Sequence, residues 1–108
     1  MINNRIRQLL EFLQEEPSDA FSAYALGLEY LKMNNLPAAE AVLSDLLNRS
    51  PEYLAGYYQL GKVYEVLKNR EKAIKVYDHG IQLAKAQQNG HTLAELQNAR
   101  MNLLIDDE

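Results

Sequence analysis

The short segment Leu-Gly-x-x-Tyr occurs twice in this chain, as LGLEY at residues 26–30 and as LGKVY at residues 60–64. The two copies lie 34 residues apart, and several other identities share that spacing. A period of this length predicts stacked supersecondary units that share one core. The identities are Tyr24 and Tyr58, Leu26 and Leu60, Gly27 and Gly61, Tyr30 and Tyr64, Asn35 and Asn69, Ala39 and Ala73, and Val42 and Val76.

The two glycines lie inside amphipathic runs, where glycine costs about 1 kcal/mol relative to alanine. Such a cost predicts a compensating close approach by a second helix, and Ala39 and Ala73 are expected to supply the small partner. Breaks are expected at Asn34-Asn35 before Pro37 and at Lys68-Asn69, so each copy is predicted to be a helical hairpin. The apolar residues at helical spacing are expected to form its core: Leu26, Tyr30, Val42, Leu43 and Leu46 in one copy, and Leu60, Tyr64, Val76 and Tyr77 in the other.

The pattern predicts six helices, at about 3–15, 19–33, 37–49, 52–67, 70–88 and 91–105. The shift by 34 also moves Pro17 onto Pro51, so the first helix is expected to be half a repeat. The fifth helix is expected to run on to Asn89-Gly90, where glycine suits a left-handed C-terminal cap. The first helix is predicted to pack through Ile2, Ile6, Leu9, Leu10 and Leu13, and the last to turn Leu93, Leu96, Leu103 and Leu104 inward before the acidic end Asp106, Asp107 and Glu108.

Length and charge exclude several classes of protein. A chain of 108 residues with 47% apolar and 24% charged residues predicts one folded domain. Its net charge of −4 opposes binding to phosphate backbones and anionic lipid, and the lack of cysteine excludes thiol catalysis and thiolate metal sites. No apolar run of secretory or membrane-spanning length is visible, which predicts a cytoplasmic protein.

The repeat resembles the tetratricopeptide repeat, which combines Leu-Gly, an aromatic residue, a later alanine and a closing proline at a 34-residue period. Ala23 and Leu43 depart from its usual aromatic positions, and Lys85 stands where a proline would close the second copy. The resemblance implies an all-α superhelix, a short solenoid over residues 1–108 with a half repeat at 1–17, repeats at 20–53 and 54–87, and a capping helix at 91–105. The matching residues are Ala23, Leu26, Gly27, Tyr30, Ala39, Leu43 and Pro51, then Tyr57, Leu60, Gly61, Tyr64, Ala73 and Tyr77.

The resemblance also implies a concave groove, lined by the first helix of each pair, that holds a peptide or a helix of a partner protein. Tyr24 and Tyr58 are expected to stack side by side there as anchors, because tyrosine offers a large rigid surface with a hydroxyl. The alternative is that both tyrosines pack between neighbouring helices. The residues at the groove positions are Phe21, Tyr24, Leu28 and Leu31 from the first copy, and Tyr58, Lys62, Glu65 and Val66 from the second.

Other ligand chemistries are poorly supported. Only Lys62 offers a cation in the groove, which argues against the carboxylate clamp that some members of the family use. An acidic chain argues against reading of single-stranded RNA. His91 and Glu95 have a spacing that two metal ligands could use, but two ligands do not make a site. No cofactor and no catalytic residues are predicted. The cluster Lys68, Arg70, Lys72 and Lys75 is expected to be a solvated helix face.

Two functions remain from different classes. The preferred one is a protein-interaction module that binds a peptide or helix of a partner protein in the groove. The alternative is self-assembly into a homo-oligomer without a peptide ligand. The acidic end of the chain disfavours end-to-end stacking, so the chain is predicted to be a monomer or a weak homodimer. The identity of the partner does not follow from the sequence.

Overall fold

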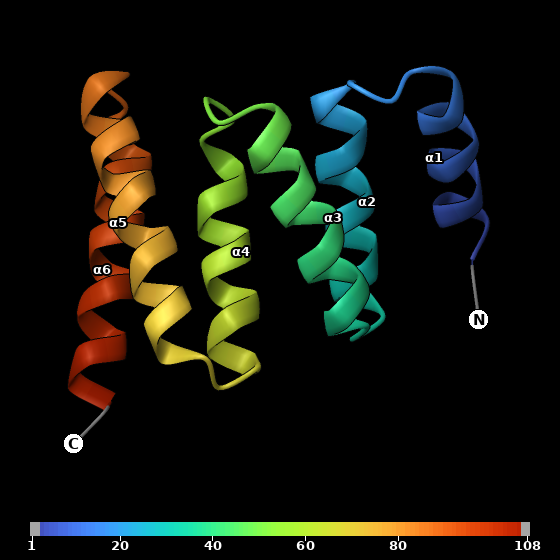
Figure 1. Ribbon diagram of the computed structural model, residues 1–108. Helices are drawn as coiled ribbons and strands as arrows, with labels where there is room; N and C mark the ends of the chain where they lie inside the picture. The colour runs from blue at the N-terminus through green and yellow to red at the C-terminus, as the bar shows by residue number, and fades with distance from the viewer. Residues whose placement is uncertain (1–2, 107–108) are drawn as a thin grey trace. The chain divides into compact units, whose positions relative to one another are not determined.

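The computed structural model describes residues 3–106, and within them it contains six α-helices and no strand (Figure 1). The six helices predicted from the sequence are confirmed, and so is the all-α fold class. The largest difference is at the fourth helix, which begins after a turn at residues 51–54 rather than at residue 52. The helices are α1 (Asn4–Glu15), α2 (Ala20–Lys32), α3 (Leu36–Arg49), α4 (Ala55–Val66), α5 (Arg70–Ala86) and α6 (Gly90–Asp106).

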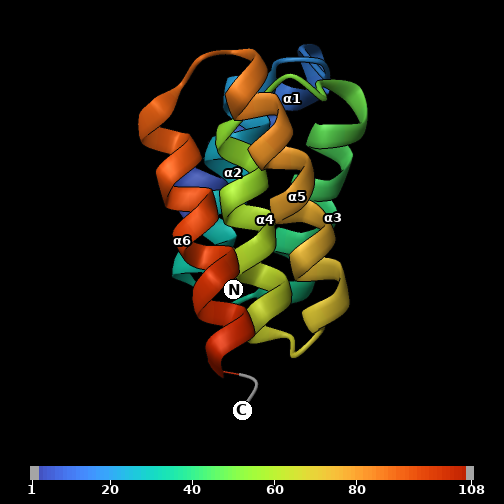
Figure 2. The same cartoon turned by 90° about the vertical axis from the view of Figure 1, so that its left-hand side faces the viewer.

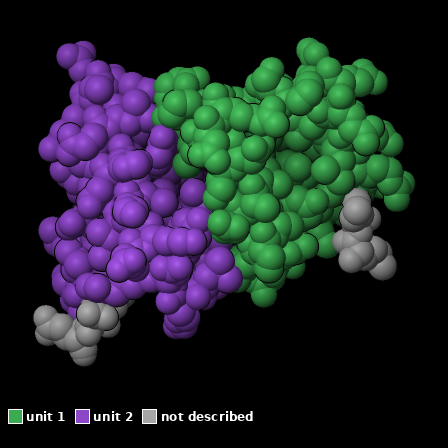
Figure 3. All heavy atoms as spheres, in the orientation of Figure 1, with its two compact units in different colours: residues 1–53 green, residues 54–108 purple. Residues whose placement is uncertain are grey.

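The helices group into two compact units, which contain α1 to α3 and α4 to α6 (Figure 3). The first unit comprises residues 1–53, and in it α2 packs against both α1 and α3. The second comprises residues 54–108, and in it α5 packs against α4 and α6, while α4 also contacts α6 (Figure 2). Each unit therefore has one hairpin and one extra helix. The division of the chain into repeats within a single domain stays a prediction.

Short polar side chains begin five of the six helices. An asparagine or aspartate at this position accepts a hydrogen bond from a backbone N–H of the first turn, which would otherwise lack a partner. The chain therefore marks its own helix starts locally. The donors and acceptors are Ile6 N to Asn3 Oδ1 at 2.7 Å, Ser22 N to Asp19 Oδ2 at 3.0 Å, Ala38 N to Asn35 Oδ1 at 3.3 Å, Lys72 N to Asn69 Oδ1 at 3.2 Å, and Thr92 N to Asn89 Oδ1 at 3.0 Å.

Three turns place a residue other than glycine in the left-handed region, directly before a capping asparagine. The prediction that Gly90 would be the left-handed cap of the fifth helix is wrong, because Gly90 is the first residue of α6. Because Asn89 caps the start of α6, the chain reverses at the residue before it, Gln88, as it does at the residue before the cap in the two earlier turns. The left-handed residues are Asn34 (φ 58°), Lys68 (φ 64°) and Gln88 (φ 57°).

The core of the first unit joins α1 to the hairpin of α2 and α3. Ile6, Leu9 and Leu26 are buried together. Gly27 faces Leu43, and an ideal Cβ atom on this glycine would lie 2.7 Å from the Leu43 Cδ2 atom. The glycine therefore makes room for a leucine from α3. Half-buried residues pack around the cluster: Leu10, Leu13, Ala25, Tyr30 and Val42.

The second unit repeats this crossing with a larger residue. Tyr77 of α5 is fully buried, and an ideal Cβ atom on Gly61 would lie 2.6 Å from its Cζ atom. Ala39 and Ala73 are fully buried, but the atoms nearest to a Cβ on each glycine belong to Leu43 and Tyr77, so close contact of the alanines with the glycines stays a prediction. The large side chain from the second helix fills the space that each missing side chain leaves.

A third crossing joins α5 to both of its neighbours. An ideal Cβ atom on Gly80 would lie 2.8 Å from the Tyr57 Cβ atom and 3.0 Å from the Leu96 Cδ1 atom. Gly80 was not predicted to lie at a helix crossing, because this glycine has no counterpart one period away. Of the predicted core residues in the two hairpins, Leu26, Leu43, Leu46, Leu60, Tyr64 and Tyr77 are buried, and Tyr30, Val42 and Val76 are half-buried.

Helix α6 covers α5 but does not bury every leucine that was predicted to face inward. Leu96 is fully buried and Leu93 and Leu103 are half-buried, as expected. The prediction for Leu104 is wrong, because this residue is 39% exposed and lines an open hollow together with Ile81 of α5. Ile2, Asp107 and Glu108 lie outside the described residues. No helix within residues 3–106 is long and apolar enough to cross a membrane.

Candidate functional site

The predicted site residues of the first unit lie along one side of α2. Phe21, Tyr24, Leu28 and Leu31 follow one another at helical spacing, which places them on a common face. Phe21 is 68% exposed, which is unusual for so large an apolar side chain. The other three are half-buried. This face of α2 is therefore partly apolar and open to a ligand at Phe21.

Tyr24 has an aromatic partner that the sequence analysis missed. Its ring centroid lies 5.4 Å from that of Tyr53, with the ring planes tilted by 49°. A tyrosine hydroxyl is protonated at neutral pH, since its usual pKa is about 10, and burial, followed by the nearby Tyr24 and Asp19, raises the pKa of the Tyr53 hydroxyl further. Tyr53 lies in the turn after α3. Its position two residues after Pro51, where the chain enters the next helix, could have indicated that it lies close to the predicted site.

The predicted site residues of the second unit lie on α4. The Lys62 Nζ atom lies 5.4 Å from the centre of the Tyr58 ring, over its face, and 3.8 Å from a Glu65 carboxylate oxygen. Val66, one turn further, is 58% exposed. A cation on a tyrosine face next to an exposed apolar residue forms a mixed surface, polar at one end and apolar at the other.

Glu65 also has a structural role. Its carboxylate accepts a hydrogen bond from the Tyr77 hydroxyl, which links α4 to α5. Burial, followed by this hydrogen bond, raises the pKa of Tyr77 far above its usual value. Because Tyr77 and Lys62 both approach this carboxylate, Glu65 belongs to the interior of the hairpin as much as to the predicted binding face.

The structure brings the predicted residues together within each unit. On α2 they are Phe21, Tyr24, Leu28 and Leu31, and on α4 they are Tyr58, Lys62, Glu65 and Val66. Tyr24 and Tyr58 are each half-buried, which fits either of the two roles weighed for them. The side-by-side stacking of these two tyrosines stays a prediction, because they belong to different units.

Some charged residues outside these faces have close neighbours of their own. Lys72 places its Nζ atom 5.5 Å from the centre of the Tyr64 ring. The His91 Nε2 atom lies 3.6 Å from a Glu95 carboxylate oxygen, at the exposed start of α6. Over the described part of the chain, no group of three or more histidine or acidic side chains is placed to hold a metal ion. The His91–Glu95 pair is a surface contact between two residues one turn apart.

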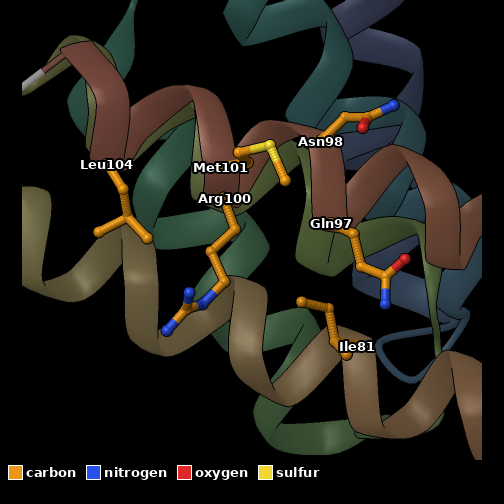
Figure 4. Close-up of a pocket in the computed structure, with 6 residues that line it drawn as sticks. All are labelled: Ile81, Gln97, Asn98, Arg100, Met101 and Leu104. Carbon is orange, nitrogen blue, oxygen red and sulfur yellow. The ribbon is translucent and has the colours of Figure 1, made fainter.

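Each unit has an open hollow on its surface. The hollow of the first unit holds about 300 Å³ and is bounded by Leu13, Pro17, Ala23, Leu26, Ala41, Val42 and Asp45. The hollow of the second unit holds about 600 Å³ and lies along α6 (Figure 4). Its walls are Ile81 of α5 and Gln97, Asn98, Arg100, Met101 and Leu104 of α6.

Comparison with known proteins gives one consistent family. The tetratricopeptide repeat model matches residues 54–87. A tetratricopeptide repeat domain protein from Salinibacter ruber, solved by NMR, is 39% identical over 81% of this chain and 88% of its own, with a TM-score of 0.76. None of the curated proteins matches the chain.

Two more distant structures share the fold. A protein from Bordetella parapertussis is 22% identical with a TM-score of 0.83, over 99% of this chain and 92% of its own. The TPR2B domain of yeast Sti1, solved in a complex with pHsp70, is 16% identical with a TM-score of 0.87, over 94% of this chain and 81% of its own.

Proposed function

Because the chain belongs to the tetratricopeptide repeat family, whose fold generally mediates protein–protein interaction, we propose that it binds a peptide or helix of a partner protein through the outer faces of α2 and α4. The binding residues are those on the two faces described above, with Phe21 and Tyr24 as the main anchors of the first unit. The TPR2B domain of yeast Sti1, which shares the fold, provides a solved example of a complex. The role is one of recognition, without catalysis and without a cofactor.

The exposed aromatic group on α2 carries this proposal. Phe21 is largely exposed to solvent and lies three residues before Tyr24. Phe21 and the Tyr24–Tyr53 pair belong to the same unit. Exposed large aromatic residues beside half-buried ones are enriched where partners bind, because they offer large contact area at low entropic cost. The protonated Tyr53 hydroxyl adds a hydrogen-bond donor to this apolar surface. We therefore expect a ligand with an apolar or aromatic side chain beside a backbone carbonyl or another acceptor.

The α4 face sets a second preference. The ammonium group of Lys62 lies over the Tyr58 ring and near Glu65, so its charge is partly balanced within the unit. A ligand held mainly by its terminal carboxylate would need several free cations, and Lys62 is the single cation among the eight proposed binding residues. We propose recognition of an internal apolar segment rather than of a carboxylate terminus.

The test is a selection of peptides from a random display library with the wild-type chain, followed by measurement of affinity for a selected peptide. Replacing Phe21 by alanine removes the most exposed anchor, and truncation of an aromatic hot spot commonly costs about 2 kcal/mol, or about thirtyfold in affinity. The matched control is Phe12→Ala, because Phe12 is also an exposed phenylalanine of the first unit, at 47%, but lies on α1.

Phe21→Ala should melt with the wild type, since the Phe21 side chain is largely solvated, and Phe12→Ala, at a half-covered side chain, should lower the melting temperature only slightly. Equal losses of affinity at Phe21 and Phe12, or none at either, would refute the assignment of the α2 face. The double variant Tyr24→Ala and Tyr58→Ala then separates the two roles of the tyrosines. A loss of binding with an unchanged melting temperature identifies anchors, and a lower melting temperature identifies packing residues.

A further inference from the structure

The turn between α5 and α6 (Figure 2) joins an asparagine directly to a glycine. Asn89 is followed by Gly90, whereas every other asparagine of the chain is followed by a residue with a side chain. Both residues are exposed to solvent, and the space that a Cβ atom on Gly90 would occupy is open to a distance of 4 Å. Packing around this dipeptide therefore leaves its backbone room to change conformation.

An asparagine followed by glycine can react with its own main chain. The backbone nitrogen of the glycine attacks the Cγ atom of the asparagine, forms a new C–N bond and gives up its proton. The bond from Cγ to the side-chain nitrogen breaks, so ammonia leaves and a five-membered succinimide ring remains. The two reacting groups are held in one chain, which makes an enzyme unnecessary. A side chain on the second residue hinders the ring closure, and glycine has none.

The cap of α6 decides how strongly the fold opposes this reaction. The Asn89 Oδ1 atom accepts a hydrogen bond from the Thr92 backbone N–H at 3.0 Å. Ring closure needs other side-chain and backbone angles, so this bond must open first. The attacking nitrogen of Gly90 is in the first turn of α6, where backbone N–H groups have no carbonyl partner within the helix. A single capping bond restrains the reaction by only about fivefold.

Two other turns of the chain provide an internal comparison. Asn35 and Asn69 also follow a left-handed residue, and each accepts a hydrogen bond from the backbone N–H three residues later, at 3.3 Å and 3.2 Å. They are followed by Leu36 and Arg70. The three caps thus share one turn design, and the residue that supplies the attacking nitrogen differs.

We infer that Asn89 is a site of spontaneous deamidation in the folded protein, through attack by the Gly90 nitrogen. Water opens the succinimide at one of its two carbonyl carbons. One opening gives aspartate, and the other gives isoaspartate, in which the main chain runs through the former side-chain carbon. In sum, one amide and one water become one carboxylate and ammonium, with no change of oxidation state. This modification does not depend on the proposed function.

The two products should affect α6 differently. Aspartate caps a helix as well as asparagine does, and its negative charge is favourable at a helix N-terminus. Isoaspartate adds one atom to the main chain and moves the carboxylate away from the Thr92 N–H that Asn89 caps. Helix α6 packs on α5 through buried Leu96, whose Cδ1 atom would lie 3.0 Å from a Cβ atom on Gly80. The aspartate form should therefore keep the wild-type melting temperature, and the isoaspartate form should melt lower.

The test is incubation of the folded full chain at a temperature well below its melting temperature, at several values of pH from neutral to mildly alkaline. Peptide mapping by mass spectrometry follows the amides of Asn35, Asn69 and Asn89, and ion exchange follows the added negative charge. Asn89 should convert to aspartate and isoaspartate about fivefold more slowly than in a synthetic peptide of residues 85–94. The rate should rise with hydroxide concentration, because the attacking nitrogen loses its proton. Asn35 and Asn69 should stay intact over the same period.

The matched control is Gly90→Ala, which adds one methyl group in open space and leaves Asn89 as the cap. Its conversion should fall to the level of Asn35 and Asn69, with an unchanged fold by circular dichroism. An Asn89 amide that survives in the folded chain while the peptide reacts overturns the inference. So does Gly90→Ala that converts as fast as the wild type, or equal conversion at all three asparagines.

Discussion

The glycine in the α4–α5 crossing offers the sharpest test of the packing. Replacing Gly61 by alanine adds one methyl group inside a helix, which by helix propensity alone stabilises the chain by about 1 kcal/mol. The new Cβ atom would lie 2.6 Å from the Tyr77 Cζ atom and 2.7 Å from its Cδ1 atom, distances far below van der Waals contact. The effect of the substitution therefore depends on whether Tyr77 can move.

Tyr77 has little freedom to move. Its ring is rigid and fully buried, and its hydroxyl is held by the Glu65 carboxylate. Overpacking of a buried site typically costs about 1 to 3 kcal/mol, and a rigid neighbour places Gly61→Ala in the upper part of that range. After the gain in propensity, we expect a net loss of about 1 to 2 kcal/mol. For a domain of this size the melting temperature should fall by about 4 to 8 °C for each kcal/mol.

Two other glycines serve as graded controls, measured by thermal and urea denaturation under the same conditions. At Gly27 the new methyl group would meet the terminal Cδ2 atom of Leu43 at 2.7 Å, and the flexible end of a leucine can rotate away, so Gly27→Ala should cost less. At Gly90 no atom lies within 4 Å, so Gly90→Ala should be neutral or slightly stabilising. If Gly61→Ala is as stable as Gly90→Ala, the close contact between Gly61 and Tyr77 is refuted.

Two further predictions concern single side chains. Tyr77→Phe removes the hydrogen bond to Glu65 and should cost about 0.5 to 1.5 kcal/mol at neutral pH. Because the folded state raises the pKa of Tyr77, the unfolded chain loses this proton first as the pH rises above about 10. The free energy of unfolding by which the wild type exceeds Tyr77→Phe should therefore shrink above that pH. Urea titrations at neutral and alkaline pH measure this difference, and a constant difference would contradict the prediction. Asn69→Ala removes the cap that accepts from the Lys72 backbone N–H and should cost about 1 kcal/mol, whereas Asn69→Asp should keep most of the stability; equal melting temperatures for all three proteins would argue against the cap.

Much of the fold follows from local chemistry and was predictable without coordinates. Apolar residues at helical spacing predict the helices, and the repeated asparagines at positions 35 and 69 predict where two of them begin, because a cap needs only its own turn. The 34-residue period identifies the glycines as sites of close approach. The period weakens at the end of the chain, where the capping residues Asn69 and Asn89 are only 20 residues apart, and there the prediction that Gly90 reverses the chain failed.

For the candidate site, the sequence alone identified which positions share a face of α2 or α4, since this depends only on the helical period. Contacts between helices had to come from the tertiary structure, because they depend on how two helices cross. Packing placed Leu43 and Tyr77 against the glycines, and it paired Tyr53 with Tyr24. It also left Leu104 exposed at an open hollow beside Ile81 of α5, because only part of the apolar surface of α6 can be covered by its neighbour.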